Sequence, residues 1–164
     1  MDLEAPAFLW LPLLAVGAHL VEEFVWPGGF PEWYRWYRPE RASSVTTRYL
    51  VIVNAVLVVL ALLPPVLGAT PRGVALWLMV AAIGAANALF HLFATVSRRR
   101  YSPGVVTGTV FYLPLAIIGY QQLVASGRVS MGTTIEAVVI GIGFHLWSAW
   151  NHKRRASTEK LKSS

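Results

Sequence analysis

Five long apolar stretches constrain this chain more than any other feature of its sequence. A helix that crosses a bilayer core about 30 Å thick needs about 20 mostly apolar residues. Stretches of that length lie at 7–26, 49–69, 73–96, 104–125 and 131–150. Charged residues make up 13% of the chain, where soluble domains have about 25%. The sequence therefore predicts an all-α membrane bundle of five transmembrane helices and excludes a water-soluble domain.

The basic residues predict the orientation of this bundle. If the flanks of the five stretches are assigned alternately to the two sides, one side receives 12 of the 14 Lys and Arg residues, and the other keeps Arg72 and Arg128. The positive-inside rule then places the N-terminus outside and the C-terminus in the cytoplasm. The same rule explains the net charge of +6, so we expect no nucleic-acid partner.

We expect the chain to consist of a membrane-embedded bundle and a short C-terminal tail. Asp2 and Glu4 precede the first stretch where a signal peptide would carry basic residues, so we expect a retained helix. Residues 1–155 are expected to form the bundle, and 156–164 a polar, disordered cytoplasmic tail. The aromatic and basic segment 26–38 is expected in the headgroup layer. Small residues in the last three stretches predict close helix packing.

Polar side chains lie inside these apolar stretches, where insertion of an ionisable group is costly and usually marks a function. They are His19, Glu22 and Glu23 in the first stretch, Asn54 in the second, Asn87 and His91 in the third, and Glu136 and His145 in the fifth. At 1.5 Å per residue, the three histidines and Asn54 lie about 9–12 Å inside the cytoplasmic ends of their stretches. We therefore expect one buried polar site near the cytoplasmic face. Glu136, about 13 Å farther out, is expected to be an interfacial or packing residue, and His152 to be solvated.

Helical spacing indicates what this site binds. His19, Glu22 and Glu23 share one helix face, and paired His and Glu side chains on helices build metal sites in bundles. Because the chain has no cysteine, nitrogen and oxygen ligands are expected, which suit zinc or iron and also manganese. The expected metal ligands are His19, Glu22, Glu23, His91 and His145, and the expected catalytic residues are Glu22, Glu23 and His19. Asn54, Asn87 and Tyr101 are expected to support them, and Thr107 to bond only with backbone.

Such a site favours a membrane enzyme that acts on a hydrophobic or lipid-like substrate from the surrounding membrane lipid. A metal ion would activate water for hydrolysis or activate oxygen. Two alternatives use the same residues. One is a metal-free acid–base isomerase or terpene-type cyclase in which a glutamate stays protonated. The other is a proton or metal-ion carrier. A carrier needs alternating access, which is hard to assemble from five short stretches without internal repeats.

Three motifs in order resemble those of a known family. They are His19-Leu20-Val21-Glu22-Glu23, the second histidine His91, and Tyr101-Ser102-Pro103-Gly104. Together they resemble the HXXEE family of small bacterial integral membrane proteins over roughly residues 8–150. The resemblance implies a multi-pass protein of the bacterial cytoplasmic membrane and supports the position of the site, but it implies no reaction. Tyr101, beside a run of arginines, is also expected to meet an anionic headgroup.

Overall fold

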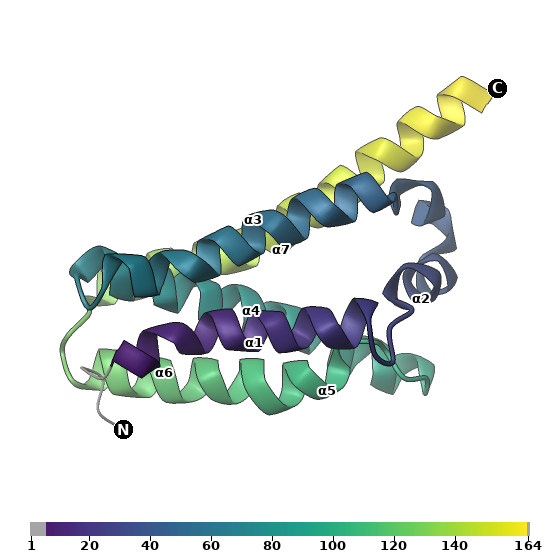
Figure 1. Ribbon diagram of the computed structural model, residues 1–164. Helices are drawn as coiled ribbons and strands as arrows, with labels where there is room; N and C mark the ends of the chain where they lie inside the picture. The colour runs from purple at the N-terminus through teal and green to yellow at the C-terminus, as the bar shows by residue number, and fades with distance from the viewer. Residues whose placement is uncertain (1–5, 164) are drawn as a thin grey trace.

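The chain forms a bundle of helices in a computed structural model that describes residues 6–163, with side chains described for 7–158 (Figure 1). This part of the chain has seven α-helices and no strand. The elements are α1 (Pro6–Phe24), α2 (Phe30–Tyr37), the 3-10 segment η1 (Pro39–Ser44), α3 (Thr47–Leu67), α4 (Pro71–Arg98), α5 (Val105–Thr107), the π-helical turn η2 (Gly108–Tyr112), α6 (Leu113–Ala125) and α7 (Met131–Ser163). The all-α prediction is confirmed.

Four helical segments within the described residues are long and apolar enough to cross a membrane. They are Ala7–Phe24, Thr47–Leu67, Pro71–Arg98 and the continuous run Val105–Ala125 through α5, η2 and α6. These match four of the five expected stretches. The fifth, 131–150, lies in α7 but is not among the four, because Glu136, His145 and several small or hydroxyl residues dilute its apolar character. The count of five spans is therefore not confirmed.

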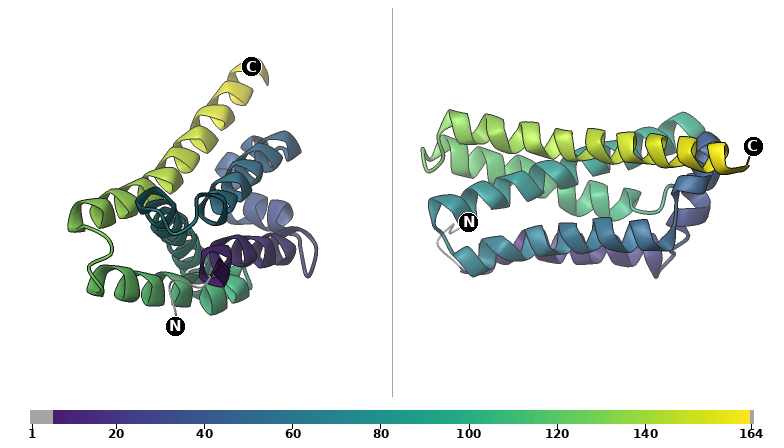
Figure 2. Two further views of the ribbon diagram at one scale, coloured as in Figure 1. Left: turned by 60° about the vertical axis from the view of Figure 1, so that its left-hand side comes forward. Right: turned by 90° about the horizontal axis from the view of Figure 1, so that it is seen from above.

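Helix α4 lies at the centre of the bundle and packs against α1, α3, α6, η2 and α7. Figure 1 and Figure 2 show α3 and α7 along one side of α4, and α1 and α6 along the other. Close contacts at glycine allow this packing: a Cβ at Gly141 of α7 would lie 2.6 Å from Cβ of Ala82, and one at Gly108 would lie 3.1 Å from Cβ of Ala88. Small residues therefore set the helix spacing, as the sequence predicts.

Helix α2 covers one end of the bundle, which we call the α2 end. Its residues alternate between two faces: Trp33, Tyr34 and Tyr37 are buried, whereas Arg35 and Trp36 are exposed. The buried face packs in one cluster with the last turns of α4. The segment expected at the membrane surface is thus folded onto the bundle and closes it above the polar residues of α1 and α4.

The end of α7 corrects two predictions. The expected disordered tail is helical, because α7 continues to Ser163 and extends beyond the other helices (Figure 1). His152, expected to be solvated, is 7% exposed. Its Nδ1 lies 2.6 Å from Oγ of Ser44, which donates to the carbonyl of Arg41 and therefore accepts from the imidazole. Contact with η1 thus holds this part of α7.

We expect low pH to release the end of α7. Burial, followed by the guanidinium groups of Arg155 and Arg41, lowers the pKa of His152 from 6.5 to about 4. The imidazole is neutral in the docked helix, so its contribution to docking is complete above pH 6.5 and is lost as the pH falls from 6.5 to about 4. A spin label on a Ser157→Cys variant, the only cysteine in that chain, should become more mobile over this range. In His152→Gln the mobility should not change with pH, and an unchanged pH dependence would assign the effect to another group.

Candidate metal centre

Three side chains from two helices bring their ligand atoms together at the α2 end. They are His19 and Glu23 of α1 and His91 of α4, which are all buried and offer ligand atoms within 4.8 Å of one another. Oε1 of Glu23 lies 3.5 Å from Nε2 of His19 and 3.2 Å from Nε2 of His91. His19 and Glu23 share a face because they are four residues apart on one helix. Among the described residues no other such group is found.

Each imidazole directs Nε2 toward Glu23 and forms a hydrogen bond through its other nitrogen, Nδ1. Nδ1 of His19 lies 2.9 Å from Oγ1 of Thr107, and Nδ1 of His91 lies 2.7 Å from Oγ of Ser102. Both Nε2 atoms are buried and make no hydrogen bond of good geometry; the polar atom that faces both is Oε1 of Glu23. A buried polar atom without a partner is costly, and histidine ligands of metals are usually held by a hydrogen bond at the other ring nitrogen. The donor set therefore fits a metal ion.

Glu22 faces the start of α5 and lies outside this group. Its carboxylate accepts from the hydroxyl of Tyr101 at 2.6 Å, from the backbone N–H groups of Val106 and Thr107, and from the hydroxyl of Thr107. The Thr107 hydroxyl donates to Glu22, so its oxygen accepts from the Nδ1–H of His19. This chain of bonds leaves the lone pair of Nε2 free to bind a metal. Glu22 thus anchors α5 and, through Thr107, fixes the tautomer of His19.

The loop before α5 covers the two imidazoles. Gly104 has a φ of 102°, which L side chains rarely adopt. A Cβ at this position would lie 2.6 Å from Cε1 of His19 and 3.1 Å from Cε1 of His91. Ser102 and Pro103 in the same loop are buried. Only glycine lets this backbone approach so close to both rings.

Tyr101 begins this loop and points its hydroxyl at Glu22. Partial burial, together with the hydrogen bond to Glu22, raises the pKa of Tyr101, so its hydroxyl remains a donor at neutral pH. The expected supporting role of Tyr101 therefore has a partner in the structure, which is Glu22. The contact of Tyr101 with an anionic headgroup stays a prediction.

His145 lies near the centre but does not join it. Its Nε2 lies 2.8 Å from the carbonyl oxygen of Ile83, so this nitrogen is the donor. His145, Asn54 and Asn87 instead line a cavity of about 100 Å³ between α1, α3, α4 and α7, and Glu23 lines the same cavity. The structure thus divides the predicted site into a group of three possible ligands and an adjoining polar cavity. Glu136, expected to be an interfacial or packing residue, is exposed on α7.

Two supporting residues were missed from the sequence. Thr107 was expected to bond only with backbone, and Ser102 was given no role. Ser102 lies inside the Tyr101-Ser102-Pro103-Gly104 motif, and this motif is the sequence signal that indicates it. Thr107 follows the motif by about one helical turn. Neither hydroxyl could be assigned before the loop was placed against α1 and α4.

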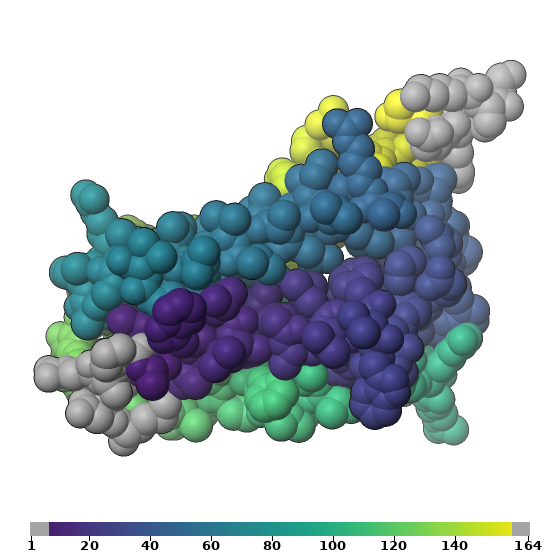
Figure 3. All heavy atoms as spheres, in the orientation of Figure 1, coloured from purple at the N-terminus to yellow at the C-terminus, as the bar shows by residue number. Residues whose placement is uncertain are grey.

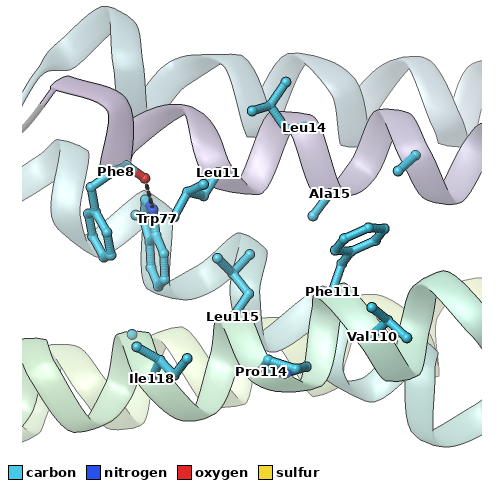
Figure 4. Close-up of a pocket in the computed structure, with 12 residues that line it drawn as sticks. Phe8, Leu11, Leu14, Ala15, Trp77, Val110, Phe111, Pro114, Leu115 and Ile118 are labelled. Carbon is cyan, nitrogen blue, oxygen red and sulfur yellow. Dashed lines mark hydrogen bonds between the residues drawn. The ribbon is translucent and has the colours of Figure 1, made fainter. Parts of the chain in front are cut away.

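A separate apolar groove of about 370 Å³ runs between α1 and α6, away from the centre (Figure 4). Aliphatic and aromatic side chains line it, among them Leu14, Phe111 and Ile118. Trp77 contributes a polar atom, Nε1, which already donates to the carbonyl of Phe8 at 3.0 Å. This groove therefore offers a ligand apolar contacts only.

Comparison with known proteins agrees with these motifs. A family described as "Protein of unknown function with HXXEE motif" matches residues 10–119. The chain is also 29% identical to the uncharacterized protein YrkK of Bacillus subtilis (strain 168) over 134 residues, which cover 78% of this chain and 82% of YrkK. No solved structure matches the chain. The matched region contains all three residues of the convergent group and the loop that covers them.

Replacing Glu22 by Gln should destabilise the protein by about 2 kcal/mol, because an amide nitrogen cannot accept the hydrogen bonds that one carboxylate oxygen receives. Thermal unfolding in one detergent measures the loss. The matched control is Glu136→Gln on the exposed surface of α7, which should change stability by no more than about 0.5 kcal/mol. Equal effects of the two substitutions would contradict the anchoring role of Glu22.

Gly104→Ala should cost more than the same change at Gly29. Both glycines have positive φ, at 102° and 83°, but nothing lies within 4 Å of a Cβ at Gly29. The backbone strain is therefore similar, and Gly104→Ala adds a clash with two buried rings, which we expect to cost about 1–3 kcal/mol more. The difference between the two unfolding temperatures checks this, and no difference would show that the loop lies farther from the imidazoles.

Proposed function

The chain belongs to the HXXEE family of unknown function, and from its buried histidines and glutamate we propose that it is an integral membrane enzyme with a metal ion held by His19, Glu23 and His91. The observation that carries this proposal is the pair of buried Nε2 atoms that face one carboxylate oxygen and make no hydrogen bond of good geometry. Two imidazoles and one carboxylate are the protein ligands of many catalytic zinc sites and of non-haem iron sites. Both kinds leave a coordination position for water or substrate.

The orientation in the membrane forms part of the proposal. We take α7 as a fifth span over 131–150, with the N-terminus outside and the C-terminus in the cytoplasm. The support is the distribution of charge, since the loops and helix ends at the α2 end carry nearly all of the Lys and Arg residues. The metal centre then lies in the cytoplasmic half of the bilayer, beneath α2.

The other polar residues have separate roles in this proposal. Glu22 and Thr107 hold His19 in the tautomer that binds a metal through Nε2, and Ser102 orients His91. This replaces the ligand role predicted for Glu22, whose oxygens already accept four hydrogen bonds. His145 lines the adjoining cavity and is likewise outside the proposed ligand set.

When bound, a metal ion would act as a Lewis acid that activates water. Iron would instead activate oxygen. The residues of the chain hold the reacting groups away from bulk water, since all three ligands are buried. A hydrophobic or lipid-like substrate suits such a site, because the surrounding helices are apolar and long enough to cross a membrane. Metal identity decides the reaction class: zinc would favour hydrolysis and iron oxygen activation.

Elemental analysis of the full-length protein, purified in detergent without added chelator, tests the proposal. We expect about one zinc, iron or manganese ion per chain. His19→Ala and His91→Ala should each lower this content at least tenfold, because two remaining ligands bind far more weakly than three. Thermal unfolding of the same samples shows whether the variants are folded.

His145→Ala is the matched control, since it removes another histidine of the bundle but no ligand. It should keep the full metal content. A metal-free wild-type protein, or a folded His91→Ala variant with unchanged metal, would overturn the metal centre. Loss of metal in His145→Ala would instead place the ion in the adjoining cavity.

A further inference from the structure

We propose that the cavity beside Glu23 binds the hydroxyl end of a single-chain lipid, whose hydrocarbon chain lies in a groove between α1 and α3. This inference deepens the proposed function, because it names the substrate class of the same site. It depends on the cavity, the groove and their shared residues, and none of these needs a metal.

Two buried polar atoms, on residues that line the cavity, have no partner. They are the hydroxyl of Tyr112, a residue only 3% exposed, and Oδ1 of Asn87. Tyr112 belongs to the π-helical turn η2 and lies against α4, where a Cβ at Gly84 would be 2.8 Å from its ring. A phenol offers a donor and an amide oxygen offers an acceptor. A ligand that both accepts and donates would satisfy the two atoms, and a hydroxyl group does both.

Charge in the cavity disfavours an ionised head. Among the described residues that line it, none is Lys or Arg, and Glu23 is the one acid. A phosphate or carboxylate would therefore enter without a Lys or Arg partner and next to a carboxylate, which is costly in an apolar interior. An ammonium group would lose its hydration for one carboxylate that already faces two imidazoles. A neutral hydroxyl avoids both costs.

The size of the cavity limits what enters it. At about 100 Å³ it holds about three water molecules, each of which occupies about 30 Å³ in the liquid. That is room for a hydroxyl and a few methylene groups, so most of a lipid chain must lie outside.

A groove of about 400 Å³ beside the cavity can take the remaining chain. It lies between α1 and α3, and Figure 3 shows the hollow between these helices on the outer face. Its walls include Leu20, Val21 and Val51. Phe24, Leu50 and Asn54 line both the groove and the cavity, so these three side chains form the boundary between the apolar surface and the polar interior.

Continuity with the polar cavity distinguishes this groove from the one between α1 and α6. The two grooves have similar volumes and both are apolar. The α1–α6 groove shares no lining residue with the cavity. A chain in the α1–α3 groove can therefore place its end beside Glu23, whereas a chain in the other groove has no such end point.

Photolabelling in phosphatidylcholine nanodiscs tests the proposal. The probe is a long-chain saturated alcohol with a diazirine at mid-chain, and mass spectrometry locates the label. We expect labelling of α1 and α3 around Val21 and Val51, and competition by unlabelled hexadecanol. Palmitate and hexadecyltrimethylammonium at the same concentration should compete at least tenfold more weakly, because each carries an ionised head.

Variants separate the parts of the site. Val21→Trp should fill the α1–α3 groove and lower labelling there at least fivefold, since it adds a large ring to the groove wall. Leu14→Trp makes a similar change on the same helix in the α1–α6 groove and should leave this labelling unchanged. Tyr112→Phe and Asn87→Leu should each weaken competition by hexadecanol about tenfold, the effect of one lost hydrogen bond to a buried polar group.

Several results would overturn the inference. They are equal labelling of both grooves, equal competition by the ionised lipids, and no effect of Tyr112→Phe or Asn87→Leu. The last result would mean that the cavity holds water and not the hydroxyl of a lipid. The His91→Ala variant keeps this test apart from that of the metal centre. Labelling that persists in that variant supports the lipid site whether or not the wild-type protein contains metal.

Discussion

The carboxylate of Glu22 carries the contact on which the arrangement of the α2 end depends. It joins α1 to the start of α5 through two backbone N–H groups and two hydroxyls. In a bundle of apolar helices, these backbone groups at a helix start would otherwise lack partners. The contact fixes the loop that contains Ser102 and Gly104, and this loop in turn covers His19 and His91. Removing one carboxylate would therefore disturb elements that are distant in the sequence.

Central helix α4 fixes the position of His91 through its packing. It contacts α1, α3, α6, η2 and α7, and small residues along it let other helices approach closely. His91 near its end is fully buried. A ligand on a helix that packs against several others keeps its orientation better than one on a loop, which favours a preformed binding site.

The adjoining cavity brings other polar residues of the bundle together. Asn54, Asn87 and His145 come from three helices and share no hydrogen bond, yet they line one space beside Glu23. An apolar surface reaches this space through Phe24 and Leu50. The convergent group and this cavity share Glu23, and the cavity shares residues with the α1–α3 groove, as the proposed lipid site requires.

Several features could be predicted from the sequence. The lengths of the apolar stretches predicted four helices to within a few residues of their observed ends, because length and composition are local properties. The equal depths of His19 and His91 in their helices correctly predicted that the two residues lie close together, since depth along a helix follows from residue number. Prediction from the basic composition of the tail failed for the end of α7, where burial of His152 against Ser44 depends on where η1 lies. It also could not assign Ser102 and Thr107, whose hydroxyls act only through a particular loop position.

The two adjacent glutamates show where sequence information ends. Helical periodicity alone places His19, Glu22 and Glu23 on one face of an apolar helix, because successive residues are separated by 100°. Glu22 and Glu23 lie on opposite sides of the His19 direction by similar angles, so periodicity treats them alike. The packing of the neighbouring elements distinguishes them, because α5 packs on one side of His19 and His91 of α4 lies on the other. Neighbouring helices, rather than the helix that bears the residues, made one glutamate an anchor and the other a possible ligand.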